Sequence, residues 1–126
     1  MYASIKKILL ITIIMLGLDT IYLGLNKNMF EQQISDVQGS KIEMNLIGAI
    51  PCYILLVLGL YYFIIRKNAP LLDAFLFGLV IYGVYETTNY TILKKWRPFT
   101  VAMDTLWGGI LMTITTWLTY SFYYGM

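Results

Sequence analysis

Residues 4–25 read SIKKILLITIIMLGLDTIYLGL, in which two lysines precede an apolar run that contains one aspartate, Asp19. A helix needs about 20 mostly apolar residues to cross a bilayer. A carboxylate inside such a helix costs roughly 2.5–3.5 kcal/mol and usually faces a protein interior or a water-filled cavity. The stretch therefore predicts a membrane-spanning helix that turns Asp19 away from lipid, which requires other helices to pack around it.

The composition of the whole chain is that of a multi-pass integral membrane protein. Of 126 residues, 59% are hydrophobic and 13% are charged, whereas a soluble domain carries about 25% charged residues. The net charge of +2 is too small to indicate nucleic acid as a partner, so the expected partner is the lipid bilayer. The chain has no histidine and one cysteine, Cys52, which excludes an intrachain disulfide and the commonest general base.

Four segments are long enough to cross the membrane, about 4–25, 45–65, 71–93 and 99–122. The connections after the second and third segments are short, which makes neighbouring helices antiparallel. We therefore predict an all-α membrane protein whose single domain, 1–126, holds four transmembrane helices in an up-down bundle.

The connector 26–44 carries a helical pattern of its own. Its apolar residues recur at i, i+4 and i+7, its polar residues occupy the other side, and Gly39 supplies a stop. We predict a short interfacial helix between helices 1 and 2, with a plain polar loop as the alternative. The apolar side holds Phe30, Ile34 and Val37, and the polar side Glu31, Gln32, Gln33 and Asp36.

Three carboxylates inside these spans fall at one depth. Asp19 lies twelve residues after Lys7, and Glu86 thirteen after Asp73, which places both about 18–20 Å from one face. Asp104 lies seven residues after Arg97, about 10 Å from the opposite face of a core about 30 Å thick. The three acids therefore converge on one level.

Polar and aromatic residues share a helix face with each carboxylate. We take the acids and one amide as the candidate proton- or cation-binding site, with aromatic and hydroxyl side chains in support. The identity of any metal is not indicated, and no catalytic residue is predicted. The binding candidates are Asp19, Glu86, Asp104 and Asn89, and the supporting residues are Tyr22, Tyr82, Trp107 and Thr105.

Two further patterns are open to two interpretations each. Residues 18–24 and 103–109 share the order Asp-Thr-aliphatic-aromatic before a glycine, which reflects either an internal duplication or chance. Gly48, Cys52 and Gly59 form a small-residue stripe, which serves either a homodimer contact or packing within the chain.

Three ordered motifs carry a family resemblance over essentially the whole chain: Asp19-x-x-Tyr22-x-Gly24, then Tyr82-Gly83-x-Tyr85-Glu86-x-Thr88-Asn89 leading to Leu93 and Trp96, then Asp104-x-x-Trp107-Gly108. This pattern resembles the DUF2177 family of small integral membrane proteins, which implies a single four-span domain. The family prefers Trp at the position of Tyr22 and Asp at that of Glu86, so both changes keep an aromatic and a carboxylate. The resemblance implies no established activity.

Function must therefore come from the site. Three carboxylates close together cannot all ionise cheaply, so we expect at least one to be protonated and able to exchange its proton for a small bound cation. The alternative is a structural or partner-binding membrane subunit without transport, in which the acids fix helix pairing. An intramembrane enzyme is the third and least supported hypothesis. A ratio of 17 isoleucines to five alanines is typical of AT-rich genomes, large DNA viruses among them.

Basic residues do not fix the orientation. One end of the bundle carries Lys6, Lys7, Arg66 and Lys67, and the other carries Lys27, Lys41, Lys94, Lys95 and Arg97. The positive-inside rule needs an asymmetry, and these counts nearly balance. The arrangement we favour has both termini in the cytoplasm.

Overall fold

The computed structural model describes residues 2–40 and 45–125, and this part of the chain is helical without strands. Residues 41–44 of the predicted connector, with Lys41, lie outside the described residues. The elements, in chain order, are α1 (Tyr2–Leu25), α2 (Lys27–Gln38), α3 (Leu46–Leu60), the π-helical turn η1 (Tyr61–Ile65), α4 (Leu71–Ile92) and α5 (Pro98–Tyr124).

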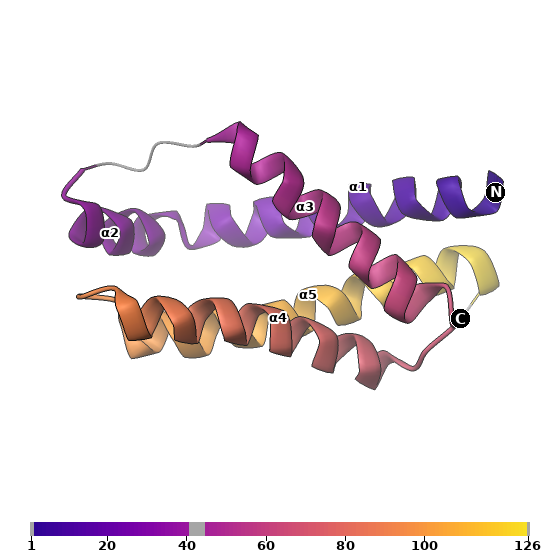
Figure 1. Cartoon of the computed structure of the whole chain (residues 1–126). Coiled ribbons are helices and arrows are strands. Elements are labelled where there is room, and N and C mark those ends of the chain that lie inside the picture. The colour runs from indigo at the N-terminus through magenta and orange to yellow at the C-terminus, as the bar shows by residue number, and fades with distance from the viewer. Residues whose placement is uncertain (1, 41–44, 126) are drawn as a thin grey trace.

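The long helices pack in the order α4, α5, α1, α3. Helices α4 and α5 lie side by side and antiparallel, and α1 packs against α5 in the opposite direction (Figure 1). Helix α3 crosses α1 at an angle and comes nearest to α4 at its end, where Gly59 faces the ring of Phe77. Both termini lie at the same end of the molecule (Figure 1).

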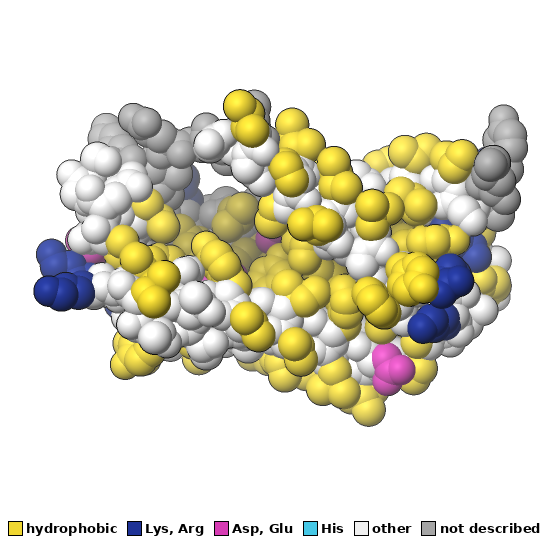
Figure 2. Space-filling model, viewed as in Figure 1, with side chains coloured by type: hydrophobic (Ala, Val, Ile, Leu, Met, Phe, Trp, Pro, Cys, Tyr) yellow, Lys and Arg dark blue, Asp and Glu magenta, His cyan; other side chains and the backbone are white. Residues whose placement is uncertain are grey.

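Large apolar side chains cover much of the outer surface (Figure 2), while several threonines and all three span carboxylates are buried inside. This inside-out distribution is expected where lipid, rather than water, surrounds the helices. Within the described residues, three helical stretches are long and apolar enough to cross a membrane, Ser4–Leu25, Ile47–Ile65 and Leu71–Ile92. Crossing by α5, whose 27 residues are more polar, stays a prediction.

Helix α2 matches the predicted helical stretch in the connector. It ends at Gly39, whose φ of 77° is in the left-handed region that glycine adopts without strain. One assignment on this helix was wrong. We placed Gln33 on the polar, outward side, but its side chain is completely buried because it packs under the turn between α4 and α5. The interfacial position of α2 stays a prediction.

Candidate carboxyl site

Asp19 is held between two neighbouring helices. The hydroxyl of Tyr53 on α3 donates a hydrogen bond to one of its carboxyl oxygens, and the indole N–H of Trp107 on α5 donates to the other at 3.1 Å. The side chain is 7% exposed. Asp19 thereby links α1 to α3 and α5.

Asp104 receives its hydrogen bond from the helix that carries Asp19. The hydroxyl of Tyr22 on α1 donates to Asp104 Oδ1 at 3.1 Å, and the ring of Tyr22 stacks on that of Trp107. Tyr22 follows Asp19 by three positions and bonds Asp104, and Trp107 follows Asp104 by three positions and bonds Asp19. Because α1 and α5 are antiparallel (Figure 1), the two Asp-x-x-aromatic segments meet with local two-fold pseudosymmetry.

Glu86 is the most deeply buried of the three acids, with 1% of its surface exposed. The indole N–H of Trp96, in the turn after α4, donates to Glu86 Oε1 at 2.9 Å. The carboxyl group of Glu86 also lies close enough to that of Asp104 for the two groups to interact electrostatically. Two buried carboxyl groups repel each other when both are ionised, and a proton on one of them removes that repulsion.

Close packing of α4 on α5 brings this carboxyl pair together. A Cβ atom on Gly78 would lie 2.0 Å from the backbone oxygen of Gly108, and one on Gly108 would lie 2.3 Å from Tyr82. Neither position has room for a side chain, so the two backbones approach as glycine alone allows. Tyr82 covers Gly108 and lies within electrostatic range of Asp19 and Asp104.

Three predicted site residues make no hydrogen bond to the acids in the described part of the chain: Tyr82, which covers Gly108, and also Asn89 and Thr105. Asn89 is half-buried one turn after Glu86, and the described residues include no hydrogen-bond partner for its side chain. The hydroxyl of Thr105 is buried without a partner in the described part of the chain, and its methyl group faces Gly83. Thr105 therefore supports the contact between α4 and α5 rather than the acids.

Comparison with known proteins gives one match. The model of the DUF2177 family, described as "Predicted membrane protein", matches residues 4–121. The chain belongs to the DUF2177 family. No curated protein and no solved structure matches it.

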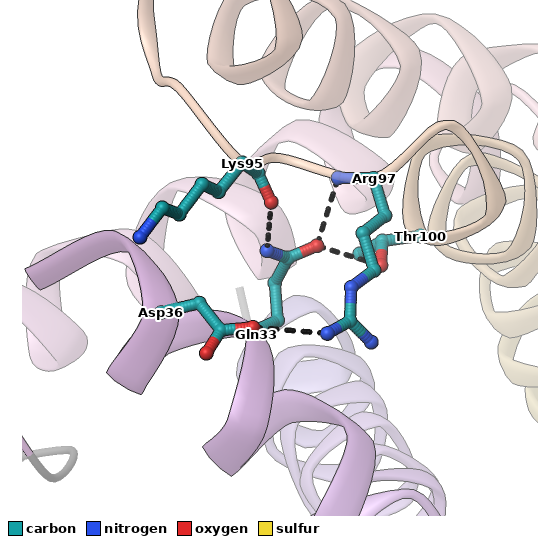
Figure 3. A network of polar contacts seen from close by, with 5 residues as sticks. All are labelled: Gln33, Asp36, Lys95, Arg97 and Thr100. Carbon is teal, nitrogen blue, oxygen red and sulfur yellow. Dashed lines mark hydrogen bonds and ion pairs between the residues drawn. The ribbon is translucent and has the colours of Figure 1, made fainter.

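In this DUF2177 protein, the side-chain amide of Gln33 holds α2 beside the candidate site. Gln33 donates to the backbone oxygen of Lys95 at 2.7 Å, and its own oxygen accepts from the backbone N–H of Arg97 at 2.9 Å. The same oxygen accepts from the hydroxyl of Thr100 at 3.1 Å (Figure 3). An ion pair between Arg97 and Asp36, 2.9 Å long, adds a contact at the rim.

This network positions two aromatic residues of the site. Phe30 on α2 packs edge-on against Tyr22, with ring centroids 5.8 Å apart, and Tyr22 in turn bonds Asp104. Gln33 holds the turn that carries Trp96, the donor to Glu86. Helix α2 therefore supports the donors on both sides of the Glu86–Asp104 pair.

Sequence reasoning missed three residues that hold the DUF2177 site together: Tyr53, Trp96 and Gln33. Tyr53 lies on α3, the long helix without an internal acid. The sequence pattern of that segment was interpreted through its small residues instead. A signal existed for Trp96, because it follows Glu86 closely in a turn and its N–H needs an acceptor when buried. Gln33 sits among other polar residues, and its sequence position does not distinguish it from exposed Gln32.

Proposed function

We propose that this membrane protein exchanges a bound proton for a small monovalent cation at the cluster of Asp19, Glu86 and Asp104. In this proposal α1, α3, α4 and α5 all cross the bilayer, and α2 lies at the interface. The observation that carries the proposal is that two buried carboxyl groups, those of Glu86 and Asp104, lie close enough to interact and accept hydrogen bonds from neutral side chains only, Trp96 and Tyr22, among the described residues.

Two carboxylates in contact repel each other strongly in a buried setting, because little water is present to screen them. A shared proton removes that repulsion and makes a hydrogen bond. No Lys or Arg side chain bonds these acids among the described residues. When the proton leaves, a cation of charge +1 restores the same balance, and this competition is the chemistry of exchange.

Access to the cluster supports exchange over a sealed core. Asp19 and Asp104 are 7% and 8% exposed, so neither is closed off completely. The face seen in Figure 2 is hollowed between α3 and α4, and acidic atoms are visible at the floor of the hollow. Within the described residues, no three acidic, histidine or cysteine side chains are grouped so as to hold a metal ion, so the exchanging groups of the proposal are the carboxyl groups of Glu86 and Asp104.

A second candidate, a purely structural role, is favoured by a different observation. Each acid accepts a hydrogen bond from another element: Asp19 from α3 and α5, Asp104 from α1, and Glu86 from the α4–α5 turn. Such bonds fix helix pairing without any ligand. In that case the acids specify the bundle, and no ion moves.

One variant distinguishes the two functions. Glu86→Gln keeps the shape and the acceptor for Trp96 but removes the group that shares a proton with Asp104. In sealed liposomes with a pH gradient and an internal pH-sensitive dye, the wild type should carry proton flux that rises with an opposing K⁺ or Na⁺ gradient. Glu86→Gln should carry less than a tenth of that flux while its unfolding temperature stays within a few degrees of wild type.

The matched control is Glu31→Gln, which makes the same chemical change at an exposed position on α2 and should leave the flux unchanged. Equal flux in wild type, Glu86→Gln and protein-free liposomes would reject exchange. An unaltered unfolding temperature in the same variant would then leave the structural role as the function of the cluster.

A further inference from the structure

The end of the molecule that holds both termini carries basic side chains lying over aromatic rings. Arg66 lies 4.2 Å from the ring centroid of Tyr62, and the Lys67 ammonium lies 5.7 Å from the same ring. Across the same end, the Lys7 ammonium lies 5.3 Å from the ring of Tyr124. We call this set the basic rim: Lys7, Arg66, Lys67, Tyr62, Phe63, Tyr123 and Tyr124.

The basic rim stands on a rigid base. The hydroxyl of Tyr120 on α5 donates to the backbone oxygen of Ala69 at 2.7 Å, which fixes the turn after η1. The hydroxyl of Tyr61 in η1 donates to Ser4 on α1 at 2.8 Å, and Lys7 donates to Tyr124 at 3.0 Å. Helices α1 and α5 and the η1 turn are thus tied together, which lowers the entropy cost of holding a ligand there.

These cations are not neutralised within the described chain. Two positive charges share the ring of Tyr62, and neither Arg66, Lys67 nor Lys7 has an acidic ion-pair partner among residues 2–40 and 45–125. At the opposite end Lys27 pairs with Glu31 and Arg97 with Asp36, whereas Lys94 and Lys95 also have no acidic partner among the described residues. The basic rim differs from that end because its unpaired cations lie over aromatic rings. Figure 2 shows dark blue side chains gathered where α3 connects to α4, with one acidic residue nearby.

The location of the basic rim indicates which class of anion it meets. Ile47–Ile65 and Leu71–Ile92 are membrane-spanning candidates, so the turn that joins them, with Arg66 and Lys67, lies at the level of the lipid headgroups. Tyr62 and Tyr124 beside the cations are about half exposed, at 51% and 49%, and exposed Tyr at a helix end contacts the boundary between acyl chains and headgroups. We infer that the basic rim binds the phosphate of anionic phospholipid headgroups.

This inference also bears on orientation. The cytoplasmic leaflet is rich in anionic lipids, and its surface attracts juxtamembrane basic residues by about 1 kcal/mol each. Binding at the basic rim therefore places this end, and with it both termini, on the cytoplasmic side. It does not depend on the proposed proton exchange, which takes place at the middle of the helices.

The test is native mass spectrometry of the full chain titrated with phosphatidylglycerol or phosphatidylcholine. The wild type should retain phosphatidylglycerol at least tenfold better than phosphatidylcholine. The triple variant Lys7→Gln, Arg66→Gln, Lys67→Gln should lose that preference, since each charge is worth about a fivefold change in affinity. The matched control is Lys27→Gln, Lys94→Gln, Lys95→Gln, which removes three charges at the opposite end and should bind as wild type.

Three results would overturn the inference. They are equal retention of the two lipids by wild type, an equal loss in the control triple variant, and full displacement of phosphatidylglycerol by millimolar inorganic phosphate, which would indicate a site for soluble phosphate. A second triple variant, Lys7→Arg, Arg66→Lys, Lys67→Arg, guards against misfolding. It keeps every charge and should retain the lipid preference.

Discussion

The ring of Tyr22 lies parallel to that of Trp107, with ring centroids 4.4 Å apart and an interplanar angle of 2°. The two rings join α1 to α5, and each reaches the aspartate of the opposite helix. Stacked aromatic pairs contribute about 0.5–1.5 kcal/mol beyond their buried area. The stack therefore sets the distance between the helices, and the two aspartates are held at a position that the rings define.

Removing only the hydroxyl of Tyr22 tests this arrangement. Tyr22→Phe keeps the stack on Trp107 but leaves Asp104 without its donor from α1, which should lower stability by about 1–2 kcal/mol. Thermal unfolding in detergent, followed by tryptophan fluorescence, measures the change. Tyr90→Phe makes the same substitution at an exposed site on α4 and should be neutral. Equal unfolding temperatures for the two variants would contradict a role for this hydrogen bond.

Replacing Gln33 tests how α2 is fastened. Gln33→Leu removes three hydrogen bonds and leaves the Lys95 carbonyl, the Arg97 N–H and the Thr100 hydroxyl without their partner. We expect a loss of about 3 kcal/mol locally, seen as faster amide hydrogen exchange across α2 while α4 stays protected. Gln32→Leu, at the exposed neighbouring position, is the control. Slow exchange in α2 of the Gln33 variant would show that another contact holds this helix.

The glycine contact between α4 and α5 should tolerate no side chain. Gly78→Ala puts a methyl group 2.0 Å from the backbone oxygen of Gly108, so the helices must separate at a cost of about 3 kcal/mol or more. Gly17→Ala on α1 meets nothing within 4 Å and should be neutral or slightly stabilising. Unfolding temperatures measure both. Similar values would mean that the contact between α4 and α5 can relax.

A homodimer through α3 is a further prediction. Gly48 and Cys52 are exposed on α3, and small residues at an outer helix face allow a partner helix to approach closely. Oxidation in native membranes should give a disulfide-linked dimer through Cys52, which Cys52→Ser abolishes. A monomeric mass in mild detergent together with no cross-link in membranes would reject the dimer.

The sequence was sufficient to predict the helices and the burial of the three acids. Apolar length and hydrophobic periodicity predicted the helical segments, and counting the rise per residue put Asp19, Glu86 and Asp104 at one level. The structure buries all three and links Asp19 to Asp104 through the stacked rings of Trp107 and Tyr22, while a shared binding site for the three acids stays a prediction. The repeated Asp-x-x-aromatic order also stood in the sequence. The sequence does not reveal that each aspartate accepts a hydrogen bond from the aromatic residue of the other helix. That pairing depends on how α1 and α5 are rotated about their axes.

Two of the three residues that escaped prediction act across long separations along the chain. Tyr53 donates to an acid on another helix, and Gln33 bonds a turn more than 60 positions away. Periodicity describes each helix by itself and carries no information about which polar side chain a distant turn will cover. For that reason Gln33 was assigned to the polar side of the connector helix. Its fully buried amide instead bonds α2 to the turn between α4 and α5.

The separation of partners along the chain has a consequence for biogenesis. Asp19 and Tyr22 bond residues 88 and 82 positions later, which at 5–20 residues per second are synthesised roughly 4–18 s after them. For part of that interval α1 has emerged from the ribosome and Tyr53, one of the two donors to Asp19, has been synthesised, while the residues of α5 that bond Asp19 and Tyr22 do not yet exist. The first helix must therefore be held by the insertion machinery, or by water at its edge, until α5 arrives and completes the membrane domain.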